Sequence, residues 1–97
     1  MTIVRYTVKP GQAEANAELV RAVFAALPEA GPALRYEVFR DGDTFTHVAH
    51  GDGLTELPAF RAFLEGHADR CVEPSVLTRV ERLGSYDGAS SVSTSIS

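Results

Sequence analysis

Histidine and tyrosine are the residue types in this chain best suited to acid–base chemistry near neutral pH. The sequence holds three of each, and Tyr36 and His47 fall in two neighbouring strand-like segments. An imidazole, with an ordinary pKa of about 6.5, can accept a proton, and a tyrosine hydroxyl can hold an oxygen of a bound molecule. Two interpretations stay open. The two side chains form a hydrogen-bonded pair in the core, or they hold a substrate hydroxyl with His47 as the proton acceptor.

His67 and Tyr6 are candidates for the same chamber. Tyr6 alternates with Val4 and Val8 along a strand-like segment, and His67 lies on the apolar stripe of a helical one. A histidine near the end of a helix can also bind the last carbonyls of that helix, so His67 keeps both a structural and a catalytic interpretation. The candidate catalytic residues are therefore His47, Tyr36 and His67.

Aromatic side chains would supply the apolar wall of such a chamber. The candidates for the substrate pocket are Tyr6, Phe24, Phe45, Phe60 and Phe63. Aromatic residues at helical spacing more often serve as ordinary core than as a ligand site, and this simpler interpretation remains open for Phe24, Phe60 and Phe63.

Other site chemistries find no support in the sequence. His47 and His50 are three apart on a strand and point to opposite faces, so they cannot chelate one metal ion. Cys71 is the only cysteine, which excludes a zinc site built on cysteine pairs, and no His–Asp relay is signalled beside it. No glycine-rich phosphate loop is present. We expect no metal and no cofactor.

Hydrophobic periodicity divides the chain into alternating strands and helices. The predicted order is strand, helix, strand, strand, helix, strand, over residues 2–9, 12–27, 33–40, 44–50, 55–68 and 75–86. Thr55 is the expected N-cap of the second helix. The first helix should bury a stripe formed by Ala13, Ala17, Val20, Phe24 and Leu27.

The segment Asp41-Gly42-Asp43 predicts a β-hairpin. A two-residue loop at either Asp41-Gly42 or Gly42-Asp43 would put Tyr36 and His47 on one face. A three-residue loop would turn the second strand over, so this facing depends on the loop length. The face of the last strand that meets the core stays open.

The βαββαβ order is that of a ferredoxin-like α+β fold, with two helices on one face of a four-stranded antiparallel sheet. Phe39 and Val48 make the other face too apolar to be left in water, which predicts a homodimer through that face. Residues 1–87 form the predicted domain. Residues 88–97 are a Ser-rich tail that cannot bury enough apolar surface to fold alone.

Composition excludes some partners. Nine basic against thirteen acidic side chains give a net charge of −4, which argues against nucleic acid as a partner. No apolar run approaches the 18 or so residues of a membrane span, so no membrane partner is expected. A single cysteine fits a reduced compartment, and we expect a cytoplasmic location.

The chain resembles the dimeric α+β barrel superfamily, most closely the antibiotic-biosynthesis-monooxygenase-like domains. The likeness covers roughly residues 1–87 and rests on three segments: 8–11 (VKPG), 36–45 (YEVFRDGDTF), and the short helix that carries Phe60, Phe63 and His67. The resemblance implies a dimer of back-to-back sheets, with a pocket in each subunit between sheet and helices. Several members oxidise phenolic or polycyclic aromatic molecules with O₂ and no metal or flavin.

Two departures narrow what the resemblance implies. The chain has no tryptophan, and its only asparagine, Asn16, falls in the first helix rather than near the first strand. This argues against the haem-degrading branch despite His67, and leaves the quinone-forming branch dependent on tyrosine and histidine. The predicted function is a cofactor-independent monooxygenase-like enzyme acting on a hydrophobic aromatic or polyketide-like molecule. The alternative is a non-catalytic barrel that binds a small hydrophobic ligand or only dimerises.

Overall fold

A computed structural model describes residues 1–86 and 88 of the chain. Its elements in chain order are β1 (Thr2–Thr7), α1 (Ala13–Ala26), a 3₁₀ turn (Leu27–Ala30), β2 (Arg35–Asp41), β3 (Thr44–His50), a 3₁₀ turn (Leu54–Glu56), α2 (Pro58–Leu64), α3 (His67–Arg70) and β4 (Val76–Arg79). The predicted Ser-rich tail, 88–97, lies outside the described residues apart from Gly88.

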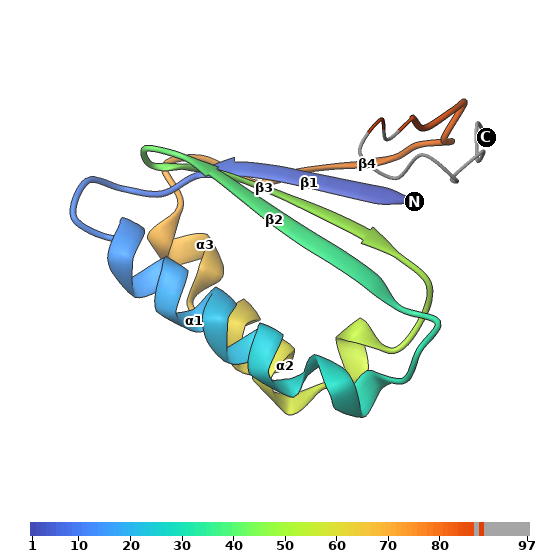
Figure 1. Cartoon of the computed structure of the whole chain (residues 1–97). Helices are drawn as coiled ribbons and strands as arrows, with labels where there is room; N and C mark the ends of the chain where they lie inside the picture. The colour runs from blue at the N-terminus through green and yellow to red at the C-terminus, as the bar shows by residue number, and fades with distance from the viewer. Residues whose placement is uncertain (87, 89–97) are drawn as a thin grey trace.

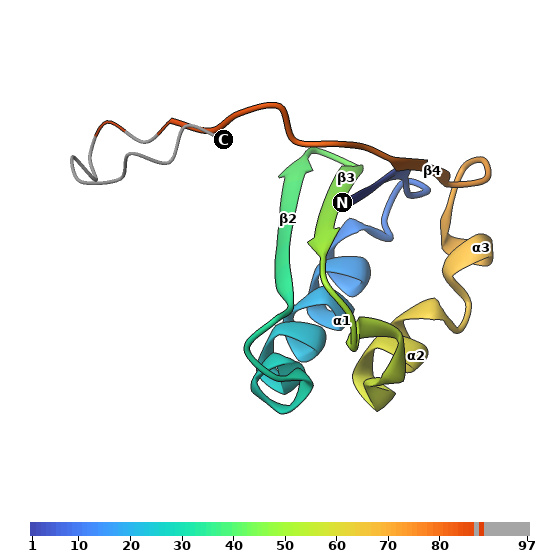
Figure 2. The same cartoon turned by 90° about the vertical axis from the view of Figure 1, so that its right-hand side faces the viewer.

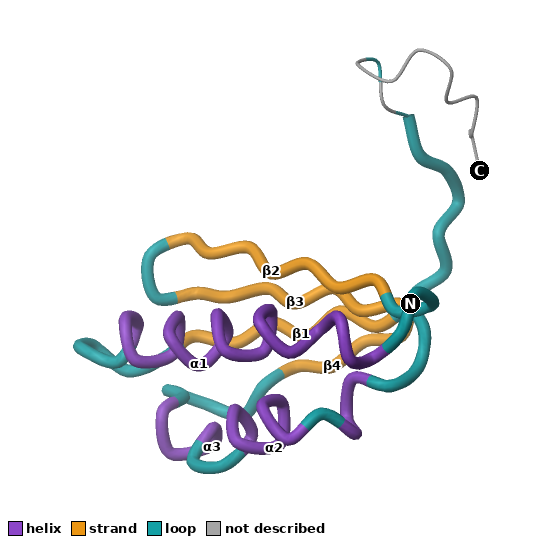
Figure 3. Tube along the Cα trace, turned by 60° about the horizontal axis from the view of Figure 1, so that its bottom comes forward, coloured by secondary structure: helices purple, strands orange, loops and turns teal. Residues whose placement is uncertain are grey.

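The four strands form one antiparallel sheet in the order β2-β3-β1-β4. Strand β3 lies between β1 and β2, so α1 crosses one face of the sheet to connect two strands that are not neighbours. Figure 1 shows the sheet as one layer with all helices beneath it, and Figure 3 shows α1 lying beside α2 and α3 in a single helical layer. The predicted ferredoxin-like α+β fold is confirmed.

The hairpin turn fixes which side chains face the helices. Asp41 pairs with Thr44, so the loop consists of the two residues Gly42 and Asp43, and Gly42 takes the left-handed φ of 61° that such turns require. The two-residue alternative is therefore correct. Phe45 and His47 consequently point toward the helices and are buried.

Helix α1 buries part of the predicted stripe, because Ala13, Ala17 and Val20 are buried whereas Phe24 and Leu27 are not. Val23 is fully buried, whereas Phe24 is 40% exposed, and Asn16 is fully buried among the alanines and valines. The predicted stripe continued from Val20 to Phe24 and Leu27, whereas the structure continues it to Val23. The helix instead buries the smaller side chain of Val23, and Phe24 packs against the ring of Tyr36.

The predicted second helix is broken into two short ones. Its N-cap is Leu57 rather than Thr55, because Pro58 occupies the first helical position, where it loses no hydrogen bond. Helix α2 ends at Leu64, where the backbone of Glu65 becomes extended. Gly66, with a left-handed φ of 71°, is the N-cap of α3, which begins at His67. His67 therefore opens a helix instead of ending one.

Strand β4 is shorter than the predicted 75–86. Arg79 pairs with Thr2, and the N–H of Val80 donates to the carbonyl of Met1 at 2.7 Å. Strand β1 begins there, so residues 81–86 have no neighbouring strand to bond with. Figure 2 shows this segment leaving β4 and running above the sheet, on the side away from the helices.

The outer face of the sheet exposes apolar side chains. Phe39 and Val76 are 56% and 64% exposed, and Leu83 and Tyr86 in the segment after β4 are more exposed still. No helix in the described part of the chain is long and apolar enough to cross a membrane.

Candidate functional site

A cavity of about 910 Å³ lies between the sheet and the α2–α3 segment. Sheet residues Val4, Tyr6, Tyr36, His47, Ala49 and Leu77 face residues Leu54, Phe60, Phe63, Leu64, His67 and Ser75 across it. The lining also includes three charged residues, all of them exposed to solvent: Asp52, Glu56 and Arg79. The interior is thus apolar with a few neutral polar groups, and the volume is typical of a small-molecule site.

His47 is held between two tyrosine hydroxyls. Its Nε2 lies 2.7 Å from the Tyr6 hydroxyl, and its Nδ1 lies 2.6 Å from the Tyr36 hydroxyl. Tyr36 is not directly opposite His47 in the sheet, because it pairs with Ala49, but its long side chain reaches diagonally to the imidazole. Both ring nitrogens of His47 are therefore occupied by protein hydroxyls.

Burial keeps these three groups neutral at pH 7. Removal from water lowers the pKa of His47 to about 4, with a smaller contribution from the nearby His67. Burial also raises the pKa of Tyr6 to about 12, although the hydrogen bond from Asn16 opposes the shift. The pKa of Tyr36 rises further for the same reason, desolvation.

Asn16 and Arg70 extend this network, and neither of them was among the site residues predicted from the sequence. The Asn16 amide donates to the Tyr6 hydroxyl at 2.9 Å, and the Arg70 Nε donates to the Asn16 oxygen at 3.2 Å. The guanidinium is held in turn by the backbone carbonyls of Phe63 and Glu65 at the end of α2. A polar residue spaced three or four positions from Ala13 and Val20, on the buried stripe of α1, is the signal that could have identified Asn16.

Phe63 forms the centre of the apolar wall. Its ring lies 5.3 Å from that of His47 and 5.9 Å from that of Phe60, and both phenylalanines line the cavity. Phe45 and Phe24 do not line it. Phe45 lies behind Tyr6, with the two rings stacked at 5.6 Å, and Phe24 covers the far side of Tyr36.

His67 lines the same cavity and is less enclosed than His47. Its Nε2 lies 2.7 Å from the Ser75 hydroxyl, and its ring meets Tyr6 edge-on at 4.5 Å. Burial lowers its pKa, and the positive charge of Arg70 adds to the shift. Cys71 lies 3.7 Å from the same Nε2, but it is buried and desolvation raises its pKa, so the thiol is not activated as a nucleophile.

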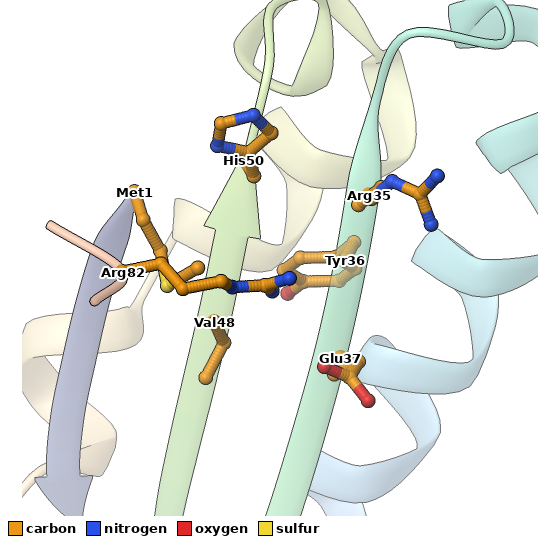
Figure 4. Close-up of a pocket in the computed structure, with 7 residues that line it drawn as sticks. All are labelled: Met1, Arg35, Tyr36, Glu37, Val48, His50 and Arg82. Carbon is orange, nitrogen blue, oxygen red and sulfur yellow. The ribbon is translucent and has the colours of Figure 1, made fainter. Parts of the chain in front are cut away.

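A second hollow, of about 380 Å³, lies on the outer face of the sheet. Figure 4 shows Arg35, Val48 and His50 on the strands, with Arg82 reaching over them from the segment after β4. His50 is thus separated from His47 by the sheet. No group of three His, Cys, Asp or Glu side chains in residues 1–86 and 88 could hold a metal ion.

Comparisons with known proteins identify the fold. The chain matches no protein-family model, and no curated protein matches it. Among solved structures, a candidate antibiotic biosynthesis monooxygenase from Nitrosomonas europaea superposes with a TM-score of 0.71 at 20% identity, over 84% of this chain and 88% of the other. A second antibiotic biosynthesis monooxygenase gives 0.69 at 12% identity, over 84% and 95%. Rv0793 from Mycobacterium tuberculosis gives 0.71 at 16% identity, over 89% and 96%. At these identities the likeness concerns the fold alone, and the chain has the fold of the antibiotic biosynthesis monooxygenase-like proteins.

Proposed function

We propose that the protein is a cofactor-independent monooxygenase-like enzyme that oxidises a hydrophobic aromatic or polyketide-like molecule. The observation that carries the proposal is the convergence of Tyr36, His47 and His67 on one apolar cavity of about 910 Å³. If phenylalanine and leucine side chains filled the space around these three residues, no room for a ligand would remain. The charged residues stand at the edge of the cavity, so the favoured ligand is uncharged over most of its surface.

The hydrogen bonds of the site support a different proposed role for each of the two histidines. His47 has no free ring nitrogen, so it orients the Tyr36 hydroxyl against an oxygen of the substrate. His67 is neutral at pH 7 because its pKa is lowered, and it is the less enclosed imidazole of the cavity. His67 is therefore the proposed proton acceptor.

The proposed reaction suits an anthrone-like phenol, in which a methylene group is activated by a carbonyl in the same ring system. His67 removes a proton from the methylene carbon, and the negative charge moves to the carbonyl oxygen beside Tyr36. A C–O bond then forms between that carbon and O₂. The proton returns to the resulting peroxide, which loses water and leaves a ketone. One oxygen atom of O₂ enters the product and the other becomes water, while the apolar wall excludes bulk solvent.

The proposal includes a homodimer through the outer face of the sheet and a cytoplasmic location. Exposed Phe39 and Val76, together with Leu83 beyond β4, give this face an apolar surface that a second copy would cover. A standard interface buries roughly 1,200 Å² or more in total. Light scattering at micromolar concentration should give twice the mass of the chain, and a monomer would contradict this arrangement. The free Cys71 fits a reducing compartment.

Oxygen consumption tests the enzymatic proposal. A panel of hydroquinones and anthrone-like phenols is incubated with the protein without added metal or flavin, and uncatalysed oxidation is subtracted. Removal of a general base typically costs 10²- to 10⁴-fold in rate, so His67→Gln should lose most of the turnover. His50→Gln, which makes the same change on the opposite face of the sheet, is the matched control and should keep it. Absence of both turnover and ligand binding across the panel would contradict the proposal. If both His67→Gln and Tyr36→Phe keep the turnover of the wild type, the roles proposed for these two residues are wrong.

A further inference from the structure

Five side chains form one continuous hydrogen-bonded series from α3 to the cavity. It starts at Arg70, passes through Asn16, Tyr6 and His47, and ends at Tyr36. Its four links measure 3.2, 2.9, 2.7 and 2.6 Å in that order. Arg70 is fixed by the carbonyls of α2, and Tyr36 lines the cavity, so one end is anchored and the other can meet a ligand.

The direction of the first two links follows from the chemistry of arginine. A guanidinium only donates hydrogen bonds, so the side-chain atom of Asn16 that faces Arg70 must be the amide oxygen. The amide nitrogen of Asn16 then faces Tyr6 and donates to its hydroxyl oxygen. The orientation of this asparagine is thereby determined by its partner.

The remaining links follow in turn. Tyr6 accepts from Asn16, and its buried O–H has only His47 Nε2 as an acceptor among the described residues. The opposite tautomer, with the proton on Nε2, would leave this buried O–H without a partner, so Nε2 acts as the acceptor. A neutral imidazole with an accepting Nε2 carries its proton on Nδ1. That N–H donates to the oxygen of Tyr36, and the Tyr36 proton is left without a partner among the described residues.

We propose that Asn16 and Arg70 are positioning residues that set this direction, so that Tyr36 presents its O–H to the cavity and selects a ligand oxygen that accepts a hydrogen bond. The class of ligand is therefore an aromatic carbonyl or an oxyanion rather than an alcohol that must donate. The ligand selectivity rests on the proposed function only in assuming that this cavity holds the ligand. The direction of the hydrogen bonds along the five side chains does not depend on the proposed function. Burial supports the assignment, because it keeps the imidazole and both phenols neutral at pH 7.

The position of the imidazole proton is the direct test. Nitrogen-15 NMR at pH 8 on histidine-labelled protein separates the two tautomers, and His47 is assigned through its contacts with the Tyr36 ring. We expect the proton on Nδ1. The Asn16→Asp variant keeps the size and the Arg70 contact but can only accept, so Tyr6 must donate to it. The His47 proton should then move to Nε2, and Nδ1 should accept from Tyr36.

Ligand preference is the second readout, measured without turnover. Fluorene, fluorenone and 9-fluorenol share one ring system, and they differ in having no oxygen, an acceptor oxygen and a hydroxyl. Wild type should bind fluorenone about five-fold more tightly than fluorene, and Tyr36→Phe should abolish the difference. In Asn16→Asp the preference should move to 9-fluorenol. Gln12→Glu adds the same charge at the exposed start of α1 and should leave both readouts unchanged.

Two results would overturn the proposal: an Nε2 proton on His47 in the wild-type protein, or an Asn16→Asp variant that keeps the wild-type tautomer and preference. The first needs no variant, so it stands even where a substitution prevents folding. Failure of the proposed function is distinguishable. A protein with the Nδ1 tautomer that binds none of the three compounds would retain the direction of the series and discard the cavity as the ligand site.

Discussion

Acid should destabilise this fold through His47 well before the carboxylates are protonated. Burial lowers the folded-state pKa of His47 to about 4, whereas the unfolded chain has the ordinary value of 6.5. Between these values the unfolded state binds the proton and the folded state does not. The stabilising contribution is therefore complete above pH 6.5 and is lost as the pH falls toward 4.

The size of the effect follows from the shift. The whole shift corresponds to about 3 kcal/mol, and about 2 kcal/mol of it should disappear between pH 7 and pH 5. This is a large share of the 5–15 kcal/mol by which a domain is stable. The pKa of His67 moves in the same direction, so the wild-type protein alone would not isolate the contribution of His47.

Urea denaturation of the wild type and of His47→Gln at both pH values isolates it. The substitution itself changes the free energy of unfolding, but this change is present at both pH values. It therefore cancels when the stability of each protein at pH 5 is compared with its own stability at pH 7. We expect the wild type to lose about 2 kcal/mol more than the variant on going from pH 7 to pH 5. Equal losses would show that His47 is not held neutral by burial and would refute the reasoning, as would an NMR titration of His47 with a midpoint near 6.5.

Two further predictions concern a glycine and the outer face. Gly51→Ala should cost more than about 2 kcal/mol of unfolding free energy, because Gly51 has a φ of 100° and a Cβ there would collide with the carbonyl of Ala33; an unchanged urea midpoint would contradict this. Phe39→Glu should abolish the proposed dimer in light scattering while leaving circular dichroism unchanged, because Phe39 is already exposed in the single chain. A dimer that survives this change would place the interface elsewhere.

Local patterns were sufficient to predict the fold but not the ends of its elements. The alternation around Tyr36 and His47 and the Asp-Gly turn predicted the hairpin and its facing, because a strand has only two faces and the loop length decides between them. The end of β4 depends instead on where β1 begins, which is a property of a distant segment. The break at Gly66 likewise needs a left-handed backbone that the apolar spacing of the second helix does not reveal.

The candidate site was predicted in part for a related reason. Tyr6, Tyr36, His47 and His67 were chosen by residue type and face, and all four line the cavity. Asn16 was set aside because it falls in the first helix rather than near the first strand. Its burial is made possible by Tyr6 and Arg70, which bind its amide, and these partners lie on distant segments that the local sequence does not reveal.

The two histidines of the cavity also illustrate why enclosure and basicity oppose one another. His47 is fixed at both nitrogens and has a pKa of about 4, so it is a weak base that would rarely take a proton from a substrate at pH 7. The same hydrogen bonds make it an effective support for Tyr36. His67 has the Ser75 hydroxyl on Nε2 and a smaller share of its surface removed from water. A pH–rate profile should therefore rise through the ionisation of His67, at a pH below the ordinary histidine value, and substitution of His47 should change substrate binding more than the position of that rise.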